Sequence, residues 1–532
     1  MDRQLDRLFN AARQRGRDAL PRRPVGRRDL LKLAAGATAF GLVGGGIILP
    51  RGGAPRAAAA EPLTQPEVRT SRDGLLDTTL TTSVQPVAVA GRTAIMSTYE
   101  GSVPGPTLRV RPGDRLRINL VNNLEQLPDG LPPSNPFLCT VPDRMRNDPD
   151  PETTCDTNLH THGFHVSPSG NSDNIFVRIK AGESFQYEYQ IPDNHPSGVY
   201  AYHPHLHGTS HIQSFAGLGG AIIVEGDLDR LPGVAGVPER LMVLQATQFT
   251  RDGGSVRDFG DGPAMTGGDG TQQRSYLRLV NGQLNPTMTI RPGETQRWRI
   301  INLTPNVTYR LHLDGHQLHQ IAKDGTTLAA PWTRDEIVMS PGERVEVLIQ
   351  AGAAGSYALR TLPIATGFTT QVDAALATLV STGEAMTPQP LPTTLMPFDD
   401  LSNARIDGRR QVTFQIKPPI GGFLGAFQVS GQDFDGARDD HVVRLNTTEE
   451  WTIRNSSTVW HPFHIHINHY QVVAINGHPV PVRSWEDTTP VPPFGDITIR
   501  TRFLDFPGRW VFHCHILVHE DNGMMQTVLA LP

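Results

Sequence analysis

The 532-residue chain has little excess charge and lacks two common nucleotide and hydrolase motifs. Its net charge is -5, and no stripe of Lys and Arg runs through its body. This balance argues against nucleic acid or an anionic membrane surface as the main partner. The phosphate-binding pattern Gly-x-x-x-x-Gly-Lys-Ser/Thr and the nucleophile-elbow pattern Gly-x-Ser-x-Gly are both missing, so neither a P-loop enzyme nor a serine hydrolase finds support.

Glycine and proline are plentiful, whereas aromatic residues make up only 7% of the chain. The chain has 52 Gly and 44 Pro, which separate short runs of Val, Ile, Thr and Leu. This pattern favours an all-β protein over a helical one. At roughly 100–200 residues per domain, the length corresponds to about three domains.

The chain also contains an internal repeat. Residues 106–120 read PTLRVRPGDRLRINL and residues 286–300 read PTMTIRPGETQRWRI, and a fainter third copy starts near Val442. Each copy predicts a strand, a tight turn and a second strand. We therefore expect three related two-sheet β-sandwiches. Their predicted boundaries are 61–228, 229–390 and 391–532.

The first 60 residues have the order of an export signal. Arg27 and Arg28 precede an apolar run from Leu33 to Leu49, and the small residues 57–60 follow it. The paired arginines resemble a twin-arginine signal. A retained membrane anchor is the alternative, although five glycines dilute the run and a spanning helix needs about 20 predominantly apolar residues.

Histidine and cysteine gather in four short clusters in the rest of the chain. They are His160-Thr161-His162, His203-Pro204-His205, His461-Pro462-Phe463-His464-Ile465-His466, and His513-Cys514-His515 with His519 and Met524. Side chains two apart on a strand point to the same face, so each His-x-His pair can serve one metal or two adjacent metals. The same alternation puts Cys514 on the face opposite His513 and His515.

These ligand types indicate copper. Imidazole suits copper, and two His, one Cys and a weak axial Met form a blue-copper site. In order and spacing, the four clusters resemble those of the multicopper oxidases, and the similarity extends from about residue 75 to the end. The resemblance implies three cupredoxin-like Greek-key domains and four copper ions.

The resemblance also assigns a role to each ligand, residue by residue. His461, Cys514 and His519 would hold the type 1 copper with Met524 as its axial ligand, and Met525 is the alternative. His160 and His464 would hold the type 2 copper. The pair of type 3 coppers would take His162, His203, His205, His466, His513 and His515. The first and third domains would then carry metal, with the middle one as a spacer.

Three further features accompany the ligands. Asp173 and Glu520 resemble the family's proton-relay acids, although either could be an ordinary hydrogen-bonding acid. His207 extends the second His-x-His pair, but the family pattern ends at His205. Cys139 and Cys155 could form a disulfide in an oxidising compartment, or remain two unpaired thiols.

The resemblance implies one-electron oxidation of phenolic or aromatic substrates, coupled to the four-electron reduction of O2 to water. A metallo-oxidase acting on Cu(I) or Mn(II) is the alternative, although the 11 methionines do not cluster. A copper-storage protein is a third possibility, but storage would not require the Cys514 bridge. We expect a monomer, exported by the twin-arginine machinery to the periplasm or outside the cell, without stable membrane insertion.

Overall fold

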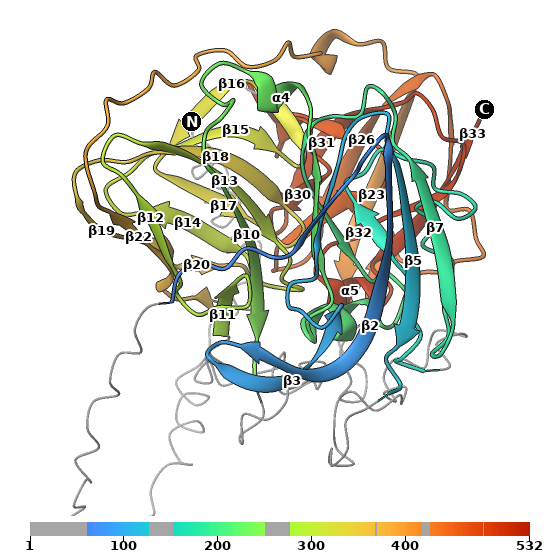
Figure 1. Cartoon of the computed structure of the whole chain (residues 1–532). Coiled ribbons are helices and arrows are strands. Elements are labelled where there is room, and N and C mark those ends of the chain that lie inside the picture. Colours follow the sequence, from blue (N-terminus) through green and yellow to red (C-terminus); the bar gives the residue numbers. More distant parts are fainter. Residues whose placement is uncertain (1–60, 127–152, 250–276, 368–369, 418–425, 482) are drawn as a thin grey trace, which may run out of the picture.

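The computed structural model describes residues 61–126, 153–249, 277–367, 370–417, 426–481 and 483–532. Strands dominate these residues, and the sheets form three sandwiches that follow one another along the chain (Figure 1). The all-β prediction is therefore confirmed. The expected export signal, residues 1–60, lies outside the described residues. Within the described ranges, no helix has the length and apolar character needed to cross a membrane.

The first sandwich contains a five-stranded and a four-stranded sheet. Its core includes Leu108, Leu116, Tyr187 and Tyr200, which come from both sheets. In sheet order, the strands are β1 (Val68–Thr70), β4 (Thr107–Val110), β9 (Gly220–Val224), β8 (Gly198–His203) and β6 (His160–His162), then β3 (Arg92–Tyr99), β2 (Leu75–Val89), β5 (Arg115–Asn123) and β7 (Ser184–Gln190). Two short helices follow β8, namely α3 (Ser210–Phe215) and α4 (Asp227–Arg230).

The second sandwich pairs a six-stranded with a five-stranded sheet around Trp298, Leu311 and Val347. The first sheet runs β11 (Leu277–Val280), β10 (Glu239–Thr247), β13 (Thr295–Asn302), β18 (Arg344–Gln350), β15 (Leu318–Lys323) and β16 (Thr326–Arg334). The second runs β12 (Thr287–Ile290), β22 (Ala374–Ser381), β19 (Gly355–Thr361), β14 (Tyr309–Leu313) and β17 (Glu336–Met339). A small separate pair is β20 (Ile364–Ala365) with β21 (Thr370–Gln371).

The third sandwich repeats the strand order of the second around Trp451, Phe463 and Phe512. Its six-stranded sheet runs β24 (Phe427–Val429), β23 (Gly408–Ile416), β26 (Thr447–Asn455), β31 (Asp496–Phe503), β28 (Tyr470–Ile475) and β29 (His478–Pro479). Its five-stranded sheet runs β25 (His441–Arg444), β33 (Met525–Leu531), β32 (Gly508–Cys514), β27 (His461–Ile465) and β30 (Thr488–Val491). The helical turns η3 (Leu401–Asn403) and α5 (Leu517–Glu520) complete this part.

The repeated sequence corresponds to repeated topology, but its two strands do not form a hairpin. Strands β4 and β5 lie in different sheets of the first sandwich, as β12 and β13 do in the second. The turn between them passes the chain from one sheet to the other. Gly113 and Gly293 have φ of +87° and +82°, which glycine adopts without the steric cost of a side chain. The predicted order of strand, tight turn and strand is therefore confirmed, and the turn joins two sheets.

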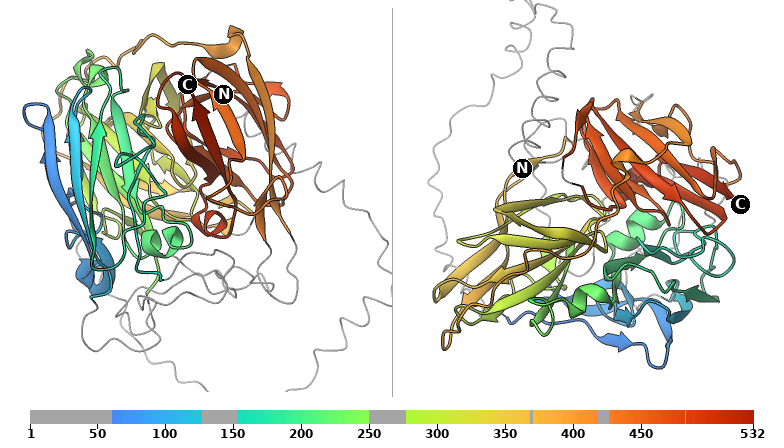
Figure 2. Two further views of the ribbon diagram at one scale, coloured as in Figure 1. Left: turned by 90° about the vertical axis from the view of Figure 1, so that its right-hand side faces the viewer. Right: turned by 90° about the horizontal axis from the view of Figure 1, so that it is seen from above.

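The first and third sandwiches are in direct contact. Helix α3 of the first lies against α5 of the third (Figure 2). The Asp521 carboxylate fixes this contact, because it accepts hydrogen bonds from the backbone N–H groups of Gly208 and His211 at 2.9 and 2.7 Å.

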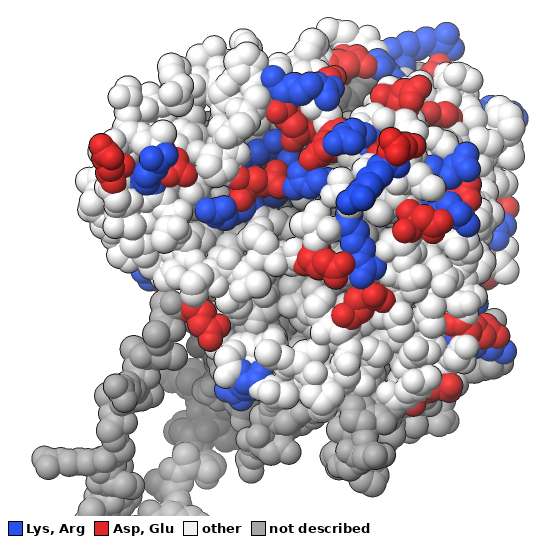
Figure 3. All heavy atoms as spheres, viewed as in Figure 1, with Lys and Arg blue, Asp and Glu red and all other residues white. Residues whose placement is uncertain are grey.

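Charged side chains of both signs mix on the surface. On the face shown in Figure 3, Lys and Arg side chains alternate with Asp and Glu in one band. Arg109 of the first sandwich forms salt bridges with Glu225 of the same sandwich and with Glu239 of the second, and Glu239 also pairs with Arg299 of the second. This mixed pattern agrees with the small net charge of the sequence.

Of the three cysteines, Cys155 is in a disulfide bond and Cys514 is a free, buried thiol. Cys139, the partner that the sequence predicts for Cys155, lies outside the described residues.

Candidate metal centre

Strand pairing within the two outer sandwiches brings the four clusters together. In the first sandwich, β6 pairs antiparallel with β8 so that His160 lies opposite His203. In the third, β27 pairs antiparallel with β32 so that His464 lies opposite His513 and Phe463 opposite Cys514. The cluster residues are all within 3% of complete burial: His160, His162, His203, His205, His461, His464, His466, His513, Cys514, His515 and His519.

One group combines sulfur and nitrogen. Sγ of Cys514 lies 3.3 Å from Nδ1 of His461 and 3.4 Å from Nδ1 of His519, and the two nitrogens are 3.2 Å apart. The three atoms form a nearly equilateral triangle within the third sandwich. Two imidazoles and one thiolate are the equatorial ligands of a blue-copper site.

Neighbouring groups put His461 in the protonation state that binds metal. The Ser457 hydroxyl donates its proton to Oδ1 of Asn455 at 2.8 Å, so its oxygen is left to accept a hydrogen bond from His461. Nε2 of His461 lies 2.8 Å from this oxygen and is therefore assigned as the donor. Nδ1 therefore keeps its lone pair and faces Cys514. Burial lowers the pKa of His461 to about 3, which keeps the ring neutral.

The thiol of Cys514 depends on a cation to ionise. Its burial raises the pKa of the thiol well above the usual range, so the copper-free site holds a neutral thiol. Thiolate is the form that binds metal, and metal binding then releases a proton. The donor set thus fits a soft, positively charged metal ion.

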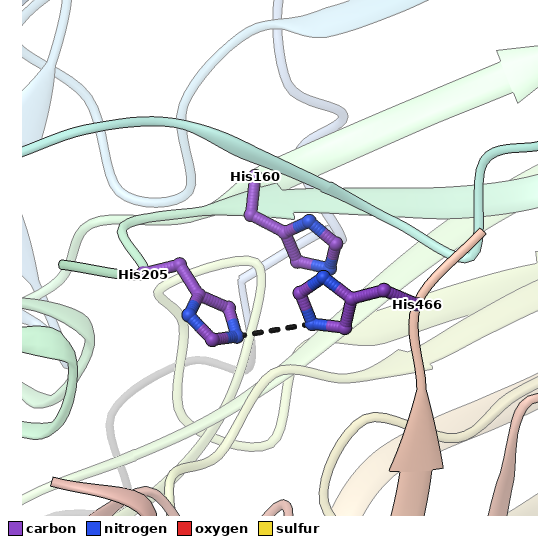
Figure 4. A group of neighbouring side chains, drawn as sticks. All are labelled: His160, His205 and His466. Carbon is purple, nitrogen blue, oxygen red and sulfur yellow. Dashed lines mark hydrogen bonds between the residues drawn. The ribbon is translucent and has the colours of Figure 1, made fainter. Parts of the chain in front are cut away.

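A second group consists of eight histidines from both outer sandwiches. Nε2 of His205 lies 3.1 Å from Nε2 of His466 and 3.1 Å from Nε2 of His513, and Nδ1 of His162 lies 3.1 Å from Nε2 of His515. Figure 4 shows how His160, His205 and His466 converge on one volume. The donor atoms form overlapping sets of three within 4.8 Å of one another, including His162, His203 and His515.

These rings are aimed inward without a protein partner for several of their nitrogens. Nε2 of His160, His203 and His464 is buried and makes no hydrogen bond. Their other nitrogens are occupied: Nδ1 of His203 and His464 contacts the carbonyl oxygens of Pro204 and Asp487 at 2.9 Å each. A buried polar atom without a partner is costly. Metal ions would satisfy these nitrogens, and the outer carbonyls fix the ring orientation.

The two predicted relay acids lie at separate histidines of this group. The Asp173 carboxylate is 2.9 Å from Nδ1 of His160, and burial raises its pKa to about 7. Glu520 Oε2 is 3.0 Å from Nδ1 of His513, and burial raises the pKa of this carboxyl too. Both are placed to hold a proton beside a metal-facing ring.

The structure separates the two candidate axial methionines. Met524 is buried in the same apolar cluster as Cys514 and Phe463, whereas Met525 packs in a different cluster with Ile175 and Val511. The backbone N–H of Cys514 also donates to the carbonyl of Met524 at 3.1 Å. Met524 is therefore the methionine on the Cys514 side.

His207 does not lie in either group of converging donor atoms. Its ring is 4.7 Å from that of Phe434.

Sequence reasoning missed four residues near the histidines: Ser457, Asp487, Arg344 and Gly342. Gly342 belongs to Ser340-Pro341-Gly342-Glu343, a turn of the same Pro-Gly-acid type as the repeat, and Arg344 directly follows this turn. The motif predicts a tight turn, but nothing in it shows what the turn contacts.

Comparisons with known proteins agree with this geometry. Three models described as multicopper oxidase match residues 405–532, residues 244–383, and residues 81–128 with 146–229. A multicopper oxidase of Staphylococcus haemolyticus is 26% identical, covering 80% of this chain and 82% of its own. A laccase of Bacillus stratosphericus is 26% identical, covering 81% of this chain and 89% of its own.

Solved structures show the same fold. A multicopper oxidase of Aquifex aeolicus superposes with a TM-score of 0.73 at 22% identity, over 89% of this chain and 100% of its own. Three cupredoxin-like sandwiches with these buried donor sets define a copper-dependent oxidoreductase. The chain belongs to the multicopper oxidase family, as the resemblance in its sequence indicates.

Proposed function

We propose that the protein oxidises small phenolic and aromatic reducing substrates one electron at a time and reduces O2 to water. The overall reaction takes four electrons and four protons per O2 and yields two water molecules. The observation that carries the proposal is the His513-Cys514-His515 tripeptide, which contributes Cys514 to the sulfur-containing group and both flanking histidines to the all-histidine group.

The ligand assignment follows the two groups of donor atoms. His461, Cys514 and His519 would hold the type 1 copper, with Met524 as its axial ligand. His160 and His464 would hold the type 2 copper. The type 3 pair would be held by His162, His203, His205, His466, His513 and His515. Copper supplies the one-electron redox chemistry of the reaction and the site at which O2 is reduced.

The protein contributes rigidity, exclusion of water and proton storage. Strand pairing holds the ligands on rigid elements, and their burial keeps bulk water from the rings. The Cys514 backbone is the short covalent path between the two groups. Asp173 and Glu520 would each hold a proton beside a metal-facing histidine, ready for the O2-reducing side.

The choice of a phenolic donor rests on relatives. Several are named laccase, including that of Bacillus stratosphericus. Others are named multicopper oxidase, without a substrate in the name.

The test is turnover by the copper-loaded protein with a phenol, Cu(I) or Mn(II) as the only donor, with O2 consumption as the readout. We expect the phenol to support the highest kcat/KM. Faster turnover of Cu(I) or Mn(II) would make the protein a metallo-oxidase instead. If none of the three donors supports O2 consumption, both the phenolic and the metal-ion assignment of the donor are contradicted.

The proposed site of action is outside the cytoplasm. Arg27 and Arg28 head the predicted signal, and the twin-arginine pathway carries folded proteins. Replacing both arginines with lysine in the full chain should retain the protein in the cytoplasm. Unchanged export of that variant, measured by cell fractionation, would exclude the twin-arginine route.

A further inference from the structure

A turn of the second sandwich lies directly against the all-histidine group. Gly342 precedes β18 and has φ of +86°. A Cβ atom at this position would lie 2.9 Å from Cδ2 of His515 and 3.0 Å from Cε1 of His162. Glycine is therefore required both by the backbone angle and by the two rings. The sandwich that carries none of the predicted ligands nevertheless packs on two of them.

The same turn leads into a buried ion pair between the second and third sandwiches. Arg344, fully buried at the start of β18, donates through Nη1 and Nη2 to Oδ1 and Oδ2 of Asp487 at 2.7 and 2.5 Å. Nη1 also donates to the Gly342 carbonyl at 3.0 Å, which ties the turn to the pair. Such a planar, two-point contact needs a guanidinium, and a lysine ammonium cannot reproduce it.

All three sandwiches meet at this pair. A Cβ atom on Gly163, directly after the first histidine cluster, would lie 2.2 Å from Nη2 of Arg344 and 2.6 Å from Oδ2 of Asp487. The first sandwich thus leaves space for the guanidinium at the residue that follows His162.

The carboxylate of Asp487 contacts His162 on the side away from the other donor atoms. Its Oδ1 lies 3.3 Å from Nε2 of His162, whereas Nδ1 of His162 faces Nε2 of His515 at 3.1 Å. An anionic oxygen beside Nε2 favours the proton on that nitrogen. Nδ1 then carries the lone pair, which is the arrangement needed to bind metal on the inner side.

Several further contacts hold Asp487 in place. Its Oδ1 accepts the hydroxyl proton of Thr488 at 2.8 Å, and its backbone N–H donates to Oδ2 of Asp324 at 3.3 Å. Asp324 also accepts from the backbone N–H of Arg344 at 3.0 Å. The position of the carboxylate is therefore set jointly by residues of the second and third sandwiches.

We infer that Arg344 is a positioning residue of the trinuclear copper site. It fixes the Asp487 carboxylate that holds His162 in the tautomer with Nδ1 toward the metal. This inference rests on the proposed copper assignment. It makes the second sandwich a structural part of the site, in addition to its role as a spacer.

The test compares Arg344→Lys with Arg299→Lys in the copper-loaded full chain. Arg299 is a matched control because it is fully buried in β13, the strand next to β18, and bonds Glu346, Glu239 and Asp229. Each protein is titrated with a copper chelator, while bound copper, the blue absorption of the type 1 site and the type 2 electron paramagnetic resonance signal are followed.

We expect Arg344→Lys to release copper from the histidine group at roughly 10–100-fold lower chelator concentration, as for other residues that orient metal ligands. Its blue absorption should persist, and Arg299→Lys should retain copper as the wild type does. Equal retention and an identical type 2 signal in Arg344→Lys and the wild type would overturn the inference. If Arg344→Lys does not fold, Asp487→Asn provides the same readout with the same expected and contrary results.

Failure of the copper assignment itself would look different. In that case the wild-type protein would show no blue absorption at full copper loading, before any variant is compared.

Discussion

Nδ1 of His461 lies 3.3 Å from Sγ of Cys514, and Nε2 of the same ring lies 2.8 Å from the Ser457 hydroxyl. The hydroxyl thus determines which nitrogen of His461 faces the sulfur. This contact joins a residue of no obvious importance in the sequence to the proposed type 1 site.

Ser457→Ala should weaken the type 1 site alone. Removal of the hydroxyl leaves the buried Nε2 of His461 without a partner and costs about 1–3 kcal/mol of stability. It also permits the tautomer with a proton on Nδ1, so we expect the type 1 copper affinity to fall by roughly 10–100-fold. Chelator titration of the blue absorption is the measurement.

Ser456→Ala is the control for that variant. Ser456 is the adjacent residue, and its hydroxyl donates to the Phe414 carbonyl at 3.1 Å and not to a histidine. Equal copper loss in the two serine variants would contradict the proposed role of Ser457.

Asp173→Asn should slow O2 reduction and spare reduction of the type 1 copper by substrate. In the wild type the Thr161 N–H donates to Oδ1 of Asp173 at 2.8 Å. The asparagine side chain keeps an oxygen that can accept this hydrogen bond, but it has no acidic proton to transfer. Stopped-flow reoxidation by O2 and anaerobic reduction by a phenol measure the two halves separately.

Copper content must be measured with the Asp173 variant, because its Nδ2 would stand where Oδ2 now faces His160 at 2.9 Å. With four coppers bound, reoxidation as fast as in the wild type would exclude Asp173 from proton delivery.

The copper-free protein should lose stability as the pH falls from about 6.5 towards 3. Burial lowers the pKa of His203, His205 and His461 to about 3, from an ordinary value of 6.5. Between these limits the unfolded chain binds more protons than the folded one. For each extra proton that the unfolded chain binds, the free energy of unfolding falls by about 1.4 kcal/mol for every pH unit of acidification.

Buried acids act in the opposite direction. The pKa of Asp173 is raised to about 7 from 3.8, so this group adds stability as the pH falls through that range. The buried histidines outnumber such acids, and we expect their effect to dominate. The measurement is Tm at pH 7 and pH 5 with and without copper. A copper-free Tm that stays constant or rises on acidification would contradict this prediction.

The structure brings the predicted histidines and Cys514 into two groups of converging donor atoms, and the sequence could indicate these residues because their pattern is local. A His-x-His pair on a strand and a cysteine between two histidines occupy only a few residues. They indicate which metal can bind and to which face of the strand each side chain points. The all-β fold follows similarly from short apolar runs between Gly and Pro. The pairing of β4 with β9, and of β5 with β2 and β7, could not be predicted, because a tight turn does not show whether its strands share a sheet.

The residues around the ligands were beyond sequence reasoning. Arg344 and Asp487 are 143 positions apart, and only the packing of two sandwiches brings them within 2.5 Å. Gly342 belongs to a recognisable turn of the second sandwich, yet its closeness to His515 depends on how that sandwich packs against the third. Such contacts leave no local pattern in the chain.

The central claim is that Cys514 joins a type 1 copper to a histidine-bound trinuclear site. Its most direct test is the visible spectrum at known copper content of the wild type and of Cys514→Ser. The wild type should bind four coppers per chain and be intensely blue, since copper bound to a cysteine thiolate gives that colour. Cys514→Ser should bind three and be colourless in that region. A wild-type protein that binds four coppers without the blue absorption would contradict the account.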